Sequence, residues 1–140
     1  MQKILVPTDG SDVALRAVKH VAQLAATGLE VEIHLVNVQP ALPQSVTQFL
    51  PAKTIADYHD EEGNEALAAA EALLKEAGLA YQRYLEIGRA GETIASLAAE
   101  LGCDQIVMGT RGLGAVSGLL LGSTTTSLLN LTSVPVTLVK

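Results

Sequence analysis

The chain has 140 residues, one cysteine and a formal net charge of −6 at pH 7, and 49% of its residues are hydrophobic. This length accommodates one domain over 1–140 that buries a core without disulfide bonds. The acidic balance argues against nucleic acid and anionic membrane surfaces as partners, because both attract basic proteins. We expect a cytoplasmic protein, since no secretory signal and no apolar run of bilayer length is found.

Strand-like and helix-like patterns alternate along the chain. In chain order, the predicted elements are a strand over 3–7, a helix from about 11 to 27, a strand over 31–38, a helix over 52–77, a strand over 81–87, a helix with its apolar stripe over 94–101, a strand over 105–108, a helix over 123–131 and a strand over 134–139. The segment 39–51 contains three prolines and is expected to be irregular.

This alternation predicts an α/β fold. Right-handed crossovers place successive strands in a mostly parallel sheet with helices on both faces. Pro135 cannot donate to a ladder, so the fifth strand is expected at a sheet edge or in a register that spares this residue. Ligands of such sheets bind beyond the carboxyl ends of the strands. The segments 7–11 and 109 onward follow the carboxyl ends of the first and fourth strands. They face each other if these two strands are neighbours in the sheet.

The segment 108–126 is rich in glycine and threonine. It is not a P-loop, because no lysine lies between Lys75 and Lys140, and it is not a dinucleotide fingerprint, because Ser117 stands where the third glycine belongs. Gly109 and Gly112 would allow a close approach of the backbone to a ligand. Gly122 and Ser123 would offer main-chain N–H groups at the start of a helix, which is a common anion site.

The residues 4–11, Ile-Leu-Val-Pro-Thr-Asp-Gly-Ser, and the spacing Gly109-x2-Gly112-x9-Gly122-Ser123 resemble the universal stress protein family. The likeness covers almost the whole chain, and the glycine spacing is that of the ATP-binding members. It implies an open, twisted, five-stranded parallel sheet of order 3-2-1-4-5 with helices on both faces, in a Rossmann-like, adenine-nucleotide hydrolase-like fold. It also implies a homodimer that pairs through the fifth strand, 134–139.

The same resemblance assigns roles to particular residues. Pro7, Thr8 and Asp9 would approach the nucleoside and sugar, the main chain near Val38 would contact adenine, Met108 and Gly109 would line the pocket, and Gly112, Gly122, Ser123, Thr124 and Thr125 would hold the phosphates. The implied ligand is ATP or another adenine nucleotide, with Mg²⁺ or Mn²⁺.

Several residues keep two interpretations. Asp9 either bonds a sugar hydroxyl or a nucleotide-bound cation, or is a turn residue that caps the first helix. Arg111, the only cation in the loop, either neutralises a phosphate or is a solvated charge. Ser123 alone is also typical of a helix N-cap. Cys103 is interpreted as a buried, inert thiol, and Ser127 as helix surface.

The sequence favours an ATP-binding, dimeric regulatory protein of the stress response. No residue stands out as a general base, so ATP hydrolysis is expected to be slow at most. The alternative is a dimeric interaction module with a vestigial pocket that contacts an unidentified protein partner. A third hypothesis is an enzyme that transfers an adenylyl group. It is less favoured, because we expect no extra domain or long insertion for a second substrate in these 140 residues.

Overall fold

The computed structural model describes residues 1–110 and 122–140. Its elements, in chain order, are β1 (Gln2–Pro7), α1 (Asp12–Ala26), β2 (Val31–Gln39), α2 (Gln44–Thr47), α3 (Ala52–Glu76), β3 (Tyr81–Ile87), α4 (Ala90–Leu101), β4 (Gln105–Gly109), α5 (Ser123–Leu131) and β5 (Val136–Val139). All nine predicted elements are confirmed, with small shifts at their ends. The short helix α2 lies in the segment that was expected to be irregular.

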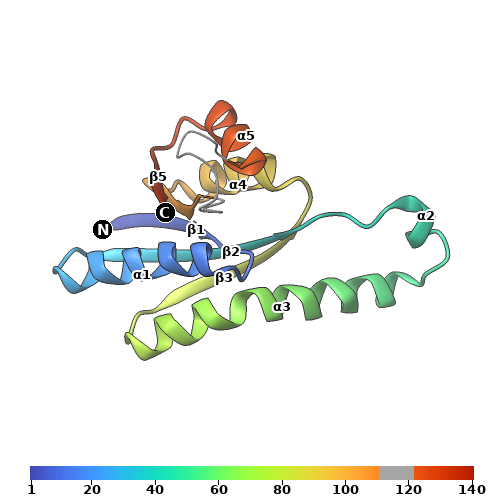
Figure 1. Ribbon diagram of the computed structural model, residues 1–140, viewed down its shortest axis with the longest axis horizontal. Coiled ribbons are helices and arrows are strands. Elements are labelled where there is room, and N and C mark those ends of the chain that lie inside the picture. The colour runs from blue at the N-terminus through green and yellow to red at the C-terminus, as the bar shows by residue number, and fades with distance from the viewer. Residues whose placement is uncertain (111–121) are drawn as a thin grey trace.

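The strands form one parallel sheet of order β3-β2-β1-β4-β5, as predicted. The helices α1 and α3 cover one face, and α4 and α5 cover the other (Figure 1). Because all five strands are parallel, their carboxyl ends lie at one edge of the sheet. Within the described residues, no helix combines the length and the apolar character needed to cross a membrane.

The edge position of β5 is confirmed, but this strand is shorter than predicted. It begins at Val136 rather than at residue 134. Pro135 has no N–H, and it joins β4 only through its carbonyl oxygen, which accepts a hydrogen bond from Ile106 N at 2.8 Å. Val134 N instead donates to Thr132 Oγ1 at 3.0 Å, so the chain before Pro135 is held in a turn.

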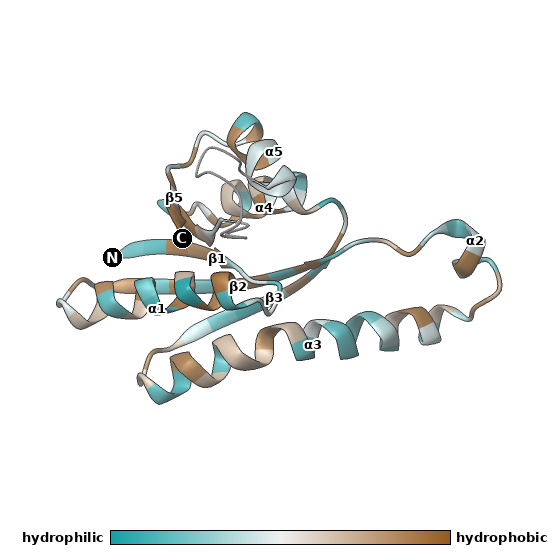
Figure 2. Ribbon diagram, in the orientation of Figure 1, coloured by the Kyte–Doolittle hydropathy of each residue, from teal (hydrophilic) through white to brown (hydrophobic). Residues whose placement is uncertain are grey.

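The core has two layers, one on each face of the sheet. Ile4 and Val6 of β1 pack toward the face covered by α1 and α3, whereas Leu5 packs toward α4 and α5. A central strand of a doubly covered sheet buries both faces, which explains its continuous apolar sequence. Polar and apolar residues are mixed along α1 and α3 (Figure 2). The buried apolar residues recur at helical spacing and face the sheet: Ala17, Val18 and Val21 on α1, and Leu67, Ala70 and Leu74 on α3.

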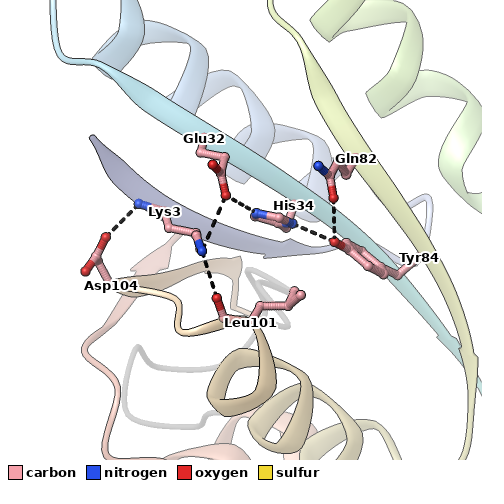
Figure 3. Close-up of polar contacts among 7 residues, drawn as sticks. All are labelled: Lys3, Glu32, His34, Gln82, Tyr84, Leu101 and Asp104. Carbon is pink, nitrogen blue, oxygen red and sulfur yellow. Dashed lines mark hydrogen bonds and ion pairs between the residues drawn. The ribbon is translucent and has the colours of Figure 1, made fainter.

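A polar network crosses three strands at the amino edge of the sheet (Figure 3). The ring of His34 on β2 is buried; its Nε2 lies 2.7 Å from Glu32 Oε2 and its Nδ1 lies 2.8 Å from Tyr84 Oη. Lys3 Nζ lies 3.7 Å from Glu32 Oε2 and donates to Leu101 O at 3.0 Å. This network ties β1, β2, β3 and the end of α4 together, far from the carboxyl edge.

Candidate functional site

A cavity of about 630 Å³ lies at the carboxyl edge of the sheet. Its walls come from the ends of β1, β2 and β4 and from the starts of α1, α4 and α5. The segments after β1 and β4 face each other there because these strands are hydrogen-bonded neighbours, as expected. Nine of the predicted site residues line this cavity: Pro7, Thr8, Asp9, Val38, Met108, Gly109, Gly122, Thr124 and Thr125.

The loop between β1 and α1 is held by short-range hydrogen bonds. Thr8 Oγ1 accepts from Gly10 N at 3.2 Å, and Asp9 Oδ1 accepts from Ser11 N at 2.9 Å. Ser11, and not Asp9, is the N-cap of α1, with its Oγ accepting from Ala14 N at 3.2 Å. Gly10 has a φ of +86°, which favours glycine. Asp9 is thus a turn residue that also lines the cavity.

Asn37 is a cavity residue that the sequence analysis missed. The residue is 3% exposed, its Nδ2 donates to Thr8 O at 2.9 Å and its Oδ1 accepts from Gln39 Nε2 at 2.7 Å. A buried amide is stable only when its polar atoms are paired, so Asn37 locks the end of β2 to the loop after β1. The sequence pattern that could have indicated this residue is a single amide side chain inside the otherwise apolar run 35–38.

Gly109 touches the first helix more closely than any other residue type would allow. A Cβ atom on Gly109 would lie 2.6 Å from Val13 O and 2.7 Å from Val13 C. The structure therefore gives this glycine a second role beside the expected approach of a ligand, because β4 packs directly on the main chain of α1. The next residue, Thr110, donates its N–H to Val139 O at 2.9 Å.

The start of α5 forms the opposite wall. Gly122 is the N-cap and Ser123 is the first helical residue, so the interpretation of Ser123 as the cap is wrong. Thr124 and the buried Thr125 line the cavity, whereas Ser123 is exposed and lies outside the lining among the described residues. The predicted site residues Arg111 and Gly112 lie outside the described residues.

Charge at the cavity is sparse. Asp9, Asp12 and Arg16 line it, and Arg16 was not singled out by the sequence. In 1–110 and 122–140, no group of three or more His, Cys, Asp or Glu side chains could hold a metal ion. The described site therefore offers hydroxyl groups, main-chain groups, two negative charges and one positive charge.

The fold and the cavity define a parallel, Rossmann-like α/β protein with a cavity at the carboxyl edge of its sheet. The model of the Universal stress protein family matches residues 1–140, and the chain belongs to this family.

Individual relatives support this assignment. The chain is 34% identical over 145 residues to Universal stress protein MJ0531 of Methanocaldococcus jannaschii, covering 99% of this chain and 82% of that protein. The solved structure of MJ0577 from the same organism superposes with a TM-score of 0.78 at 29% identity, covering 99% and 95% of the two chains. A universal stress protein solved in complex with cAMP superposes with a TM-score of 0.74 at 28% identity, covering 99% and 97%.

Proposed function

We propose that this protein binds an adenine nucleotide, with ATP as the main candidate, in the cavity at the carboxyl edge of the sheet. We also propose that it acts as a dimeric, nucleotide-dependent regulatory protein. The main-chain geometry of β2 at this cavity is the observation that supports the proposal most directly.

The end of β2 extends beyond the end of β1. Val36 O accepts a hydrogen bond from Thr8 N, so the main chain of Val36 faces β1, whereas Gln39 O accepts from Gly88 N on the β3 side. Because successive residues of a strand face opposite neighbours, the N–H and C=O of Val38 face the β1 side. The paired register of β1 ends at Pro7 opposite Val36, so Val38 has no strand partner there. An adenine ring can accept from this N–H and donate to this C=O.

Apolar side chains flank this main-chain edge. Val38, Ile94 and Met108 all line the cavity. They can cover the two faces of a flat base without an aromatic partner, and the volume is that of an ordinary small-ligand site. The neighbour solved with cAMP carries an adenine ligand on the same fold.

The phosphates would lie against the start of α5. The first N–H groups of a helix have no partner within the helix and attract anions. Gly122, Thr124 and Thr125 bring these groups and two hydroxyls to the cavity wall. Ser123, Arg111 and Gly112 remain proposed phosphate contacts.

A divalent cation fits this site only together with the nucleotide. Asp9 Oδ1 is used by Ser11 N, and the other carboxylate oxygen has no hydrogen bond among the described residues. One or two carboxylates plus phosphate oxygens are a usual Mg²⁺ arrangement. Asp9 would hold such a cation, which would neutralise phosphate charge beside the two aspartates.

Hydrolysis of ATP at this site is proposed to be slow at most. No histidine, cysteine or glutamate lines the described part of the cavity, and the two oxygens of Asp9 are assigned to its turn and to the nucleotide-bound cation rather than to a general base. Turnover of ATP to ADP by the purified protein, followed over hours, measures this directly.

Titration calorimetry with ATP and Mg²⁺ tests the binding proposal. We expect measurable binding of ATP that the substitution Gly122→Val weakens at least about tenfold, because a branched side chain would fill the space at the N-terminus of α5. Thr126→Val places the same side chain on an exposed position of α5 outside the cavity and should leave the affinity unchanged.

The outcomes separate the two hypotheses. An unsubstituted protein that binds no adenine nucleotide would contradict the proposal and favour the interaction module with a vestigial pocket. Equal affinities for the Gly122 and Thr126 variants would place the nucleotide elsewhere.

A further inference from the structure

Arg16 is a cavity residue with a defined position. It lies on α1 one turn after Asp12, and its side chain is exposed and lines the cavity. Its Nε donates a hydrogen bond to the main-chain oxygen of Lys140 at 3.0 Å. This bond joins the first helix to the end of the last strand.

The bond to Lys140 uses only one edge of the guanidinium. Among the described residues, the two terminal amino groups of Arg16 have no hydrogen bond, and none of the ion pairs found there includes Arg16. A planar guanidinium held at Nε keeps two parallel N–H donors for one partner. Phosphate oxygens match that spacing.

Arg16 lies on the β4 and β5 side of the cavity. Lys140 follows β5, and Thr110 N holds Val139 O beside the end of β4. The main-chain groups of Val38, which have no partner on β1, lie on the other side of β1, because the strand order is β3-β2-β1-β4-β5. A nucleotide with its base at Val38 would therefore extend its phosphates toward Arg16.

The charges of the described cavity favour a basic side chain on that side. Asp9 and Asp12 both line the cavity and repel an anionic ligand, and Arg16 is the one basic residue of the described lining. An exposed arginine in water contributes little by attraction alone, but a preoriented, bidentate contact contributes more.

We propose that Arg16 binds the phosphate groups of the nucleotide and that the main chain of Lys140 positions its guanidinium for this contact. The inference rests on the proposed nucleotide site and names the residue through which the protein distinguishes nucleotides from nucleosides. It also places the end of the edge strand β5 in direct contact with a ligand-binding side chain.

Calorimetry with adenosine, ADP and ATP tests this role in the unsubstituted protein and in three variants. Arg16→Gln should weaken ADP and ATP about tenfold, the usual effect of losing a charged hydrogen bond, and leave adenosine unchanged. Arg16→Lys keeps the charge but loses the planar pair of donors, so it should restore only part of the affinity. Lys19→Gln removes the same charge from an exposed position of α1 outside the cavity and should behave like the unsubstituted protein.

Hydrogen exchange of the segment 136–140 provides the readout for positioning. We expect ADP or ATP, but not adenosine, to slow exchange there in the unsubstituted protein, and we expect Arg16→Gln to abolish the difference. If Arg16→Gln lost the same affinity for adenosine as for ATP, the inference would be overturned while the nucleotide site stayed in place. The same would follow if Lys19→Gln lost as much ATP affinity as Arg16→Gln. Exchange that does not respond to ATP would overturn the positioning role, and an unsubstituted protein that binds neither ligand would contradict the proposed function and this inference together.

Discussion

At the scale of single residues, Glu32 and His34 show how polar groups are accommodated at the amino edge. The hydrogen bond from His34 lowers the pKa of the Glu32 carboxyl below its ordinary value, and the nearby charge of Lys3 adds to this effect. Burial raises the pKa of Tyr84, so its hydroxyl stays neutral in the network. The buried Cys103 agrees with the predicted inert thiol, because burial raises its pKa as well.

The lowered pKa of Glu32 makes a pH-dependent prediction for stability. The folded state favours the ionised carboxylate, so its contribution is complete above the ordinary value of 4.5 and is lost as the pH falls through the lower, folded-state pKa. In urea denaturation, Glu32→Gln should lower the free energy of unfolding at neutral pH, and the difference from the unsubstituted protein should shrink in acid. Glu30→Gln, an exposed neighbour, serves as the control. A difference that is independent of pH would contradict the assignment.

At the scale of elements, the packing of α4 on α5 shapes the cavity, because the first residues of both helices line it. A Cβ on Gly91 of α4 would lie 2.7 Å from Ser127 Oγ and 2.8 Å from Ser127 Cβ. The interpretation of Ser127 as mere helix surface is therefore wrong: this side chain fills the space above a glycine and allows the helices to approach closely.

This contact predicts a coupled pair of substitutions. Gly91→Ala should destabilise the protein by about 1–3 kcal/mol, the usual cost of overpacking. Ser127→Gly removes both atoms that clash, so the double variant should lose less stability than the sum of the single variants. Chemical denaturation of all four proteins measures the coupling free energy. Additive losses would mean that the helices move apart without resistance.

At the scale of the whole molecule, the edge strand β5 offers a surface for a second copy. Pro135 O and Val139 O face β4, so the intervening Val136 and Leu138 direct their main-chain groups away from the sheet. An exposed edge of this kind pairs readily with another strand. This geometry supports the proposed dimer through 134–139.

A proline at the edge tests that dimer. Leu138→Pro removes an outward N–H without touching the ladder to β4, whereas Leu138→Ala removes a similar amount of side chain and keeps the N–H. Sedimentation velocity should find a dimer for the unsubstituted protein and for Leu138→Ala, and mainly monomer for Leu138→Pro. Circular dichroism confirms that each variant is folded. A monomeric unsubstituted protein, or a dimeric proline variant, would rule out pairing through this edge.

From the sequence alone, we predicted every major element, the strand order through the family resemblance, and nine of the nineteen residues of the described cavity lining. These features depend on local patterns: apolar runs that end at turns, glycines that end helices, and a glycine spacing next to hydroxyl residues. The irregular segment 39–51 concealed the short helix α2, because its prolines dominate the local pattern.

The contacts between distant segments at the carboxyl edge of the sheet became known only from the tertiary structure. Asn37 bonding to the loop after β1, Gly109 resting on the main chain of Val13, and Arg16 held by Lys140 are contacts between segments far apart in the sequence. The local sequence around these residues does not indicate their partners, because the strand order and the placement of the helices determine which segments come into contact. The chain thus determined which groups reach the carboxyl edge, and the packing of β1, β4 and α1 decided how they are arranged around the cavity.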